Sequence, residues 1–144
     1  MVMWGQHLRR SVDYLATCPD VDTTRLAYLG ISWGGLLGGL MVAIEPRLKA
    51  AIFNAAGLSM SRSRPEADPI NFLPRVRIPS PMLNGKHDHF FPTETSQQPF
   101  FALIGTPPAD KRHVLYEGGH ALPRTLRIAE ALAWLDKYLG AVTR

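Results

Sequence analysis

Short apolar runs alternate along the chain with longer segments in which apolar residues recur at the spacing of a helix. The apolar runs have the length of buried strands, and turn residues follow them. The sequence therefore predicts strands over residues 25–29, 50–54, 81–84 and 113–116. The helical spacing predicts helices over residues 4–17, 34–44, 93–104 and 122–139.

Prolines mark the two places where this pattern is weakest. Residues 55–79 contain several prolines and charges, so we expect a long loop or an irregular excursion over the sheet there. Within residues 93–104, Pro99 lacks a backbone N–H donor, so the predicted helix should be short or kinked.

Strands that alternate with helices indicate an α/β fold, with a mostly parallel sheet of about four strands flanked by helices. A chain of 144 residues is long enough for one domain with a hydrophobic core, so we expect residues 1–144 to form a single domain. In open sheets of this kind, ligands bind beyond the carboxyl ends of the strands. Reactive residues that directly follow strands are therefore candidates for a site.

The composition is that of a soluble globular protein, with 46% hydrophobic and 19% charged residues. The formal net charge of +4 comes from scattered basic residues with acids between them, which disfavours nucleic-acid binding. The longest apolar stretch, residues 36–44, is far shorter than the ~20 residues of a membrane span. The single cysteine, Cys18, excludes an intrachain disulfide. We expect a cytoplasmic protein with no membrane partner.

The clearest chemical motif is Gly30-Ile31-Ser32-Trp33-Gly34, which lies between a predicted strand and a predicted helix. It matches the G-x-S-x-G nucleophile elbow, a tight turn that lifts the serine hydroxyl clear of the sheet. The backbone amide of Trp33 would then supply an oxyanion-hole donor. Taken alone, the five residues also fit a serine at the start of a helix in a glycine-rich turn.

Two further residues turn the motif into a constellation. Asp88 follows the third predicted strand and His120 follows the fourth. The order Ser, Asp, His along the chain is the one that α/β-hydrolases use for a catalytic triad. We predict that Ser32 is the nucleophile, His120 the base and Asp88 the acid that orients the base. Asp68 and Asp110 lie in polar loops and compete with Asp88 for that place.

The surroundings of the triad suggest a pocket. Phe90 and Phe91 follow Asp88 closely and are predicted to bind substrate, although aromatic residues at such positions also serve as plain core. Triad chemistry uses neither a cofactor nor a metal, so we expect none.

The same segments resemble a known branch of proteins. The matching segments are Ser11-Val12-Asp13-Tyr14-Leu15, Asp22 with Arg25 through Gly35, Asp68 through Phe72, Pro81 through Asp88, Gly118-Gly119-His120 and Trp134 through Leu139. Together they resemble the prolyl-oligopeptidase-like and dienelactone-hydrolase-like branch of the α/β-hydrolases. The resemblance implies a serine hydrolase, and members of the branch include esterases, acyl-peptide hydrolases and dienelactone hydrolases.

The front of the chain departs from that branch. Domains of the branch carry about four strands before the nucleophile strand, and the loop after the third strand gives the second oxyanion donor. Here one predicted helix precedes residues 25–29, so we expect a truncated α/β-hydrolase fold that lacks the usual N-terminal strands. The nucleophile strand would then be an edge strand with unpaired backbone groups, and we expect a homodimer that covers it.

We expect the protein to be a carboxylesterase that acts on small or short-chain acyl esters. Two alternatives stay open: a peptidase or acyl-peptide hydrolase-like fragment, and a non-catalytic interaction module derived from a hydrolase.

Overall fold

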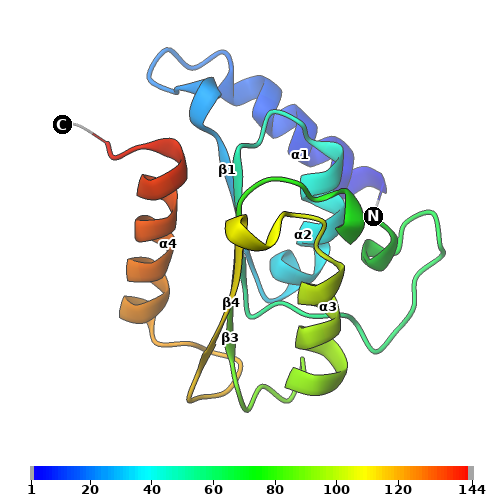
Figure 1. The fold of residues 1–144 in the computed structure, drawn as a ribbon. Helices are drawn as coiled ribbons and strands as arrows, with labels where there is room; N and C mark the ends of the chain where they lie inside the picture. The colour runs from blue at the N-terminus through cyan, green and yellow to red at the C-terminus, as the bar shows by residue number, and fades with distance from the viewer. Residues whose placement is uncertain (1, 143–144) are drawn as a thin grey trace.

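A four-stranded parallel sheet forms the centre of the computed structural model, which describes residues 2–142 (Figure 1). Neighbouring strands pair in parallel throughout, and their order in the sheet is their order in the chain. The strands are β1 (Ala27–Ile31), β2 (Ala50–Asn54), β3 (Ser80–Gly85) and β4 (Lys111–Tyr116). The predicted α/β class with about four strands is confirmed.

Helices cover both faces of the sheet, but unequally. In Figure 1, α4 stands alone on one side, and the other three helices lie on the opposite side. The helices are α1 (Val2–Leu15), α2 (Trp33–Ile44), α3 (Gln98–Leu103) and α4 (Arg124–Leu139). No helix among residues 2–142 combines the length and the apolar character that a membrane crossing requires.

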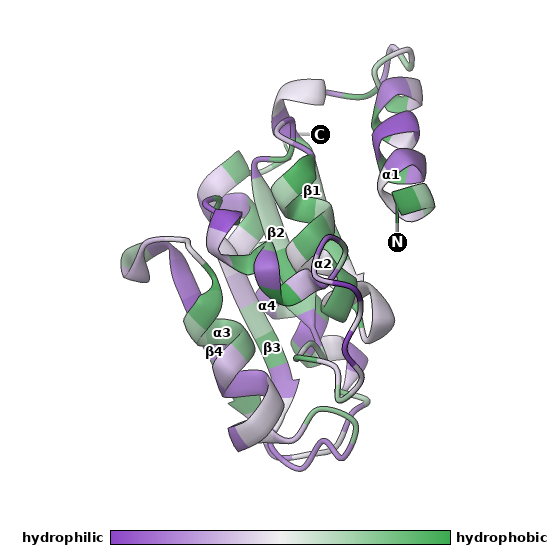
Figure 2. Ribbon diagram, turned by 90° about the vertical axis from the view of Figure 1, so that its right-hand side faces the viewer, coloured by the Kyte–Doolittle hydropathy of each residue, from purple (hydrophilic) through white to green (hydrophobic). Residues whose placement is uncertain are grey.

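The two central strands form the floor of the core. All residues of β2 and β3 are buried, because these strands have neighbours on both edges and side chains packed on both faces. Phe53 of β2 meets Phe100 of α3 edge to face, with ring centroids 5.5 Å apart. Figure 2 shows the strongly hydrophobic α2 lying across this part of the sheet.

The outer strands are less covered. On β1, Leu29 and Ile31 are 53% and 43% exposed. On β4, at the other edge of the sheet, Leu115 is 42% exposed. Helix α1 packs against α2. Within residues 2–142, β1 is therefore an edge strand with apolar side chains open to solvent, as expected.

An ion-pair bridge fastens α1 to the end of α2. Arg47 binds Asp13 of α1 at 2.7 Å and the buried carboxylate of Glu45 at 2.5 Å. The hydrogen bond from Arg47 lowers the pKa of Glu45, which keeps that carboxyl charged although it is buried. The bridge therefore holds the N-terminal helix beside the nucleophile helix.

Several predicted boundaries are wrong by two residues, among them both ends of α1 and the starts of β4 and α4. Two other differences have a clear local cause. The first strand begins at Ala27, because residues Thr23–Arg25 form a 3-10 turn in which the Asp22 side chain accepts a hydrogen bond from the Thr24 amide. The helix predicted over 93–104 is divided into a π-helical turn, Thr93–Gln97, and α3. Pro99 lies in the first turn of α3, where its missing N–H costs nothing.

The proline-rich segment 55–79 is irregular, as expected, but it is also part of the core. It contains two 3-10 turns, Pro69–Asn71 and Leu73–Arg75. Leu73 and Val76 are fully buried against α2, β2 and α3 in the main hydrophobic cluster. The segment thus forms a packed wall and not a loose connection.

We predict that Gly35→Ala destabilises the protein whereas Gly34→Ala does not. A Cβ atom on Gly35 would lie 2.8 Å from the Cβ of Ala56 and 2.9 Å from the carbonyl oxygen of Asn54, so α2 would have to move away from the sheet. Overpacking of this kind costs about 1–3 kcal/mol. At Gly34 the nearest atom would lie at 3.7 Å, an ordinary contact. Urea unfolding of both variants measures the difference, and equal midpoints would contradict the close packing.

Candidate active site

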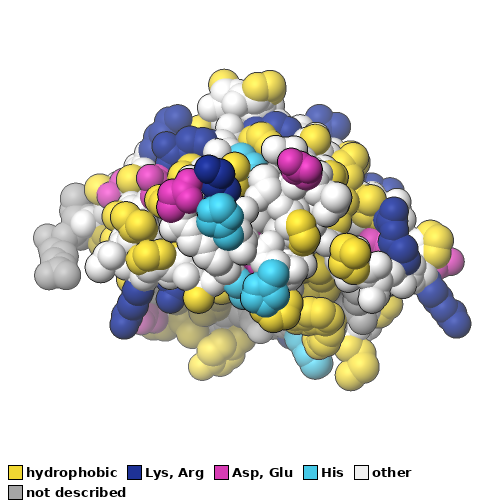
Figure 3. Space-filling model, turned by 90° about the horizontal axis from the view of Figure 1, so that it is seen from below, with side chains coloured by type: hydrophobic (Ala, Val, Ile, Leu, Met, Phe, Trp, Pro, Cys, Tyr) yellow, Lys and Arg dark blue, Asp and Glu magenta, His cyan; other side chains and the backbone are white. Residues whose placement is uncertain are grey.

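The carboxyl ends of the strands converge on the lower end of the molecule in Figure 1. Ser32 follows β1, Asp88 lies in the loop after β3, and His120 lies in the loop after β4. Figure 3 looks onto this end and shows histidine side chains gathered near its centre. The three residues predicted from the sequence therefore lie together at the carboxyl end of the sheet.

Ser32 stands on a strained turn. Its φ and ψ are 55° and −110°, outside the ordinary regions for a residue with a side chain. Such a conformation costs about 1–3 kcal/mol and persists only where the surroundings hold it. Glycine is required at Gly30, because a Cβ atom there would lie 2.3 Å from the carbonyl oxygen of Gly34.

Hydrogen bonds hold this turn from below. The Ser32 amide donates to the carbonyl of Asn54 on β2 at 2.9 Å. The hydroxyl of Tyr28 donates to the carbonyl of Gly34 at 2.6 Å. Burial raises the pKa of Tyr28 to about 12, so this hydroxyl keeps its proton across the neutral range.

A chain of two short hydrogen bonds links the three side chains. The Ser32 hydroxyl lies 2.7 Å from Nε2 of His120, and Nδ1 of His120 lies 2.7 Å from a carboxylate oxygen of Asp88. With the proton on Nδ1 donated to Asp88, Nε2 is free to accept the proton of the serine hydroxyl.

Asp88 is fixed on both of its oxygens. The oxygen that does not face His120 accepts hydrogen bonds from the backbone amides of Phe90 at 2.9 Å and Phe91 at 3.2 Å. The carboxylate is fully buried. The Asp88 carboxylate is thus buried and accepts three hydrogen bonds, from two backbone amides and from His120, so it can fix the orientation of the imidazole.

A groove of about 400 Å³ opens beside the serine and the histidine. The ring of Phe90 lies 4.9 Å from that of His120, and the ring of Phe91 lies 5.7 Å from it. Phe90 is 60% exposed and forms a rim, whereas Phe91 is buried in the core against α2. The remaining lining residues are Trp33, Leu36, Ser59 and Met60.

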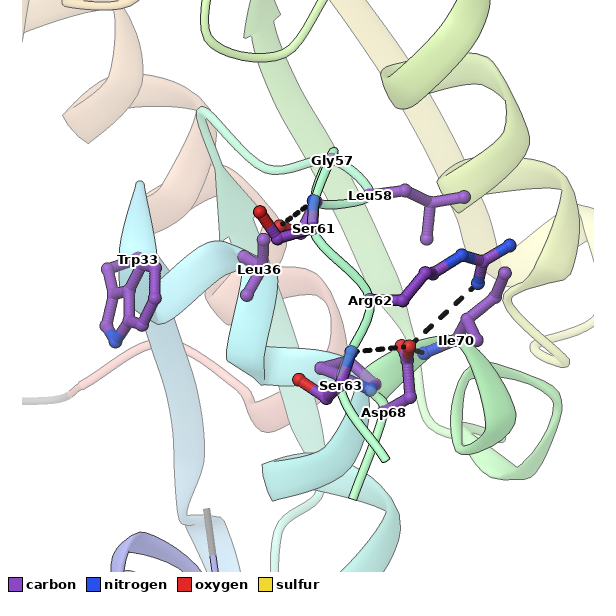
Figure 4. A pocket seen from close by; sticks show the side chains of 11 residues that line it. Trp33, Leu36, Gly57, Leu58, Ser61, Arg62, Ser63, Asp68 and Ile70 are labelled. Carbon is purple, nitrogen blue, oxygen red and sulfur yellow. Dashed lines mark hydrogen bonds and ion pairs between the residues drawn. The ribbon is translucent and has the colours of Figure 1, made fainter. Parts of the chain in front are cut away.

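A second, smaller pocket of about 110 Å³ shares Trp33, Leu36 and Ser59 with the groove (Figure 4). Figure 4 shows it enclosed between α2 and the segment that carries Arg62 and Asp68. The Asp68 carboxylate accepts hydrogen bonds from the backbone amides of Ser63 and Ile70, at 3.2 and 3.1 Å. Asp68 therefore shapes the pocket wall.

Other candidates lie outside the hydrogen-bonded chain. Asp110 sits at the start of β4, at the opposite end of that strand from His120, and it accepts a hydrogen bond from the hydroxyl of Tyr138 at 2.9 Å. His87 pairs with Glu117 at 3.1 Å. Trp33 is the first residue of α2, so its amide has no partner within the helix and stands beside the serine.

The sequence did not reveal the wall of the groove. Ser59 and Met60 come from the irregular segment after β2, for which no periodicity assigned a position. The one hint in the sequence that this segment packs closely on its surroundings is the nearby Gly57. A Cβ atom there would lie 2.3 Å from the hydroxyl of Ser96, so this segment passes very close to the turn before α3.

Known protein-family models and curated proteins give no match to this sequence. Solved structures do. A dienelactone hydrolase assigned in Klebsiella pneumoniae subsp. pneumoniae superposes with a TM-score of 0.77 at 24% identity, over 92% of this chain. An acetyl xylan esterase from Paenibacillus sp. R4 gives 0.77 at 20% over 94%. A cold-adapted esterase from an Arctic intertidal metagenomic library gives 0.74 at 20% over 91%.

The chain has the α/β-hydrolase fold. The resemblance seen in the sequence is thus confirmed at the level of the fold. The chain spans 60%, 52% and 56% of the lengths of those three structures.

Within this α/β-hydrolase fold, we predict that Asp88→Asn slows the reaction of Ser32 with a fluorophosphonate, which requires an activated serine. An amide favours the wrong imidazole tautomer, and the same replacement lowers turnover by up to about 10⁴-fold in a well-studied triad. Asp110→Asn is the matched control and should react at the original rate. If Asp110→Asn slowed the reaction and Asp88→Asn did not, the assignment of Asp88 as the acid would be wrong.

Proposed function

We propose that this protein is a serine hydrolase that cleaves carboxylic esters with small or short-chain acyl groups. The observation that carries the proposal is the hydrogen-bonded chain Ser32–His120–Asp88, with 2.7 Å at each link, on a nucleophile elbow. The esterases among the similar solved structures add support, since they build the same fold.

In the first half-reaction, Ser32 Oγ attacks the ester carbonyl carbon while Nε2 of His120 takes the hydroxyl proton. Negative charge gathers on the carbonyl oxygen, where the Trp33 amide donates a hydrogen bond to it. The imidazolium formed is stabilised by the Asp88 carboxylate. When the carbon–oxygen bond to the alcohol breaks, His120 gives its proton to the leaving alkoxide, and an acyl-serine remains.

In the second half-reaction, a water molecule takes the place of the alcohol. His120 removes one proton from the water, and the hydroxide adds to the acyl carbon. The new intermediate collapses, the Ser32 oxygen leaves, and His120 returns the proton to it. The products are a carboxylic acid and the restored serine.

The groove favours small acyl groups. Its lining is mostly apolar, from Trp33, Leu36, Met60 and the two phenylalanines, and its volume of about 400 Å³ suits a small ligand. An ester carries a better leaving group than an amide and demands less of the oxyanion hole. The alternative of a peptidase or acyl-peptide hydrolase is separated by comparing p-nitrophenyl acetate with a peptide anilide.

We predict that Ser32→Ala abolishes hydrolysis of p-nitrophenyl acetate and labelling by a fluorophosphonate. The exposed Ser11 on α1 offers the control, because Ser11→Ala removes a hydroxyl far along the chain from the elbow. Circular dichroism verifies that both variants are folded. Full turnover in Ser32→Ala would sink the assignment of the nucleophile. A wild-type protein that neither turns over esters nor reacts with the probe would favour the non-catalytic interaction module.

We also propose that two copies associate through β1 into a homodimer. An edge strand presents a row of unpaired N–H and C=O groups, and pairing with its own copy about a two-fold axis satisfies them in both chains. Leu29 and Ile31, about half exposed in one copy, would then be covered.

Light scattering over a dilution series tests the homodimer. We predict a mass of two chains for the wild type and of one chain for Leu29→Lys, because a lysine on an edge strand opposes pairing. Leu115→Lys, on the opposite edge strand β4, is the matched control and should stay dimeric. A wild-type monomer at micromolar concentration would refute the proposal.

A further inference from the structure

We infer that Gln97 is a positioning residue that holds the loop carrying Asp88 so that its carboxylate reaches His120. This inference rests on the proposed function for its kinetic consequence, but not for its geometry. Nothing in the sequence marks Gln97: it lies in a segment predicted as a short or kinked helix and is followed by a second glutamine.

Gln97 bridges the two ends of the acid loop. Its side-chain nitrogen, Nε2, donates one hydrogen bond to the carbonyl of Gly85 at 2.9 Å and another to the carbonyl of Phe91 at 2.7 Å. Gly85 is the last residue of β3, and Phe91 is one of the two residues whose amides bind the Asp88 carboxylate. Both hydrogens of one amide group thus close the loop on either side of Asp88.

Burial makes these two bonds consequential. Gln97 is 0% exposed, and Gly85 and Phe91 are buried beside it. Removal of the side chain therefore takes the Gln97 donor from the Phe91 carbonyl in a buried place, whereas the Gly85 carbonyl keeps a longer bond from the Asp88 amide at 3.4 Å. An unsatisfied buried carbonyl costs the full desolvation of the group. The loop would therefore rearrange, and Phe91 and its amide would move with it. The opposite orientation of the Gln97 amide would set its oxygen against both carbonyls, so only the donor orientation fits.

The π-helical turn Thr93–Gln97 aims this side chain. It precedes α3 directly, and Figure 1 shows α3 beginning at the end of the sheet where the site lies. The turn is fixed on both sides: the Thr93 hydroxyl donates to the carbonyl of Lys86 at 2.9 Å, and the Ser96 hydroxyl donates to the carbonyl of Leu58 at 2.8 Å. A π-helical turn inserts extra backbone into a helix start, and such turns are frequent at functional sites.

The neighbouring glutamine supplies a matched control. Gln98 carries the same side chain and lies on the next position, but it is exposed. Gln97→Met keeps the length of the side chain and removes both donors, and Gln98→Met makes the same change where nothing depends on it. Gln97→Glu is a second variant that keeps the shape and places a carboxylate against the two carbonyls.

The first measurement needs no substrate. In protein with ¹⁵N-labelled histidine, the Nδ1 proton of His120 gives a far-downfield NMR signal as long as Asp88 holds it. We expect this signal in the wild type and in Gln98→Met, and we expect it to be absent in Asp88→Asn. It should be lost or broadened by exchange with water in Gln97→Met and Gln97→Glu. An unchanged signal in folded Gln97 variants would overturn the inference.

The second measurement is a double-mutant cycle on p-nitrophenyl acetate. Gln97→Met should lower kcat by about 10²-fold, the effect of a displacement near 1 Å in a catalytic group, with a smaller change in KM. In the Asp88→Asn background the same change should have no further effect on kcat, because Gln97 acts only through Asp88. Additive losses would show a general structural role and overturn the inference.

The two measurements separate the failures. If the wild type has no esterase activity but its histidine signal disappears in the Gln97 variants, the proposed function fails and the positioning stands. If esterase activity is present and both the signal and kcat are unchanged in the Gln97 variants, the proposed function stands and the positioning fails.

Discussion

The contact between α2 and the strands beneath it is the constraint on which the site depends. Ser32 is the one residue between the end of β1 and the start of α2. The helix must therefore pack very closely on the strands, and at Gly30 and Gly35 there is no room for a Cβ atom. That approach lets the Ser32 amide reach Asn54 and the Tyr28 hydroxyl reach Gly34. These two bonds hold a backbone conformation that would otherwise relax. A shift of α2 away from the sheet would lengthen these two bonds and move the serine away from its base.

The other half of the site is built by a different device. The loops after β3 and β4 bind each other through backbone hydrogen bonds, from Lys86 to Tyr116 and from His87 to Gly118, both at 2.9 Å. Asp88 and His120 therefore share one framework, which Gln97 supports through its hydrogen bonds to the carbonyls of Gly85 and Phe91. Ser32 belongs to the α2 framework, and the bond between its hydroxyl and His120 crosses between the two. Phe91, packed against α2, also joins the two parts of the site.

The sequence predicted the elements whose burial is periodic or continuous, and it missed what depends on contacts distant in the chain. The wholly buried run 50–54 was located to the residue, since a central strand needs no polar face. The start of β1 was misplaced, because the cap by Asp22 competes locally with strand structure. The triad candidates could be named because each directly follows a strand. Gln97 could not, because one glutamine looks like another until the carbonyls that it meets are known, and Leu73 and Val76 of the irregular segment were missed as core residues for the same reason.

The connectivity of the strands also has a consequence for how the protein folds. The Ser32–His120 contact joins residues 88 positions apart in the chain, and the His120–Asp88 contact joins residues 32 apart. Parallel strands that follow each other in the chain are joined by long crossover connections. All four strands must therefore be paired before the loops that carry the three site residues lie side by side. Formation of such distant contacts is the slow part of folding, whereas helices such as α2 need only local ones. A collapsed chain with all its helices but an unpaired β4 would already possess its serine and still lack its base. The three residues of the site follow β1, β3 and β4, so the site requires the complete sheet, from its first strand to its last.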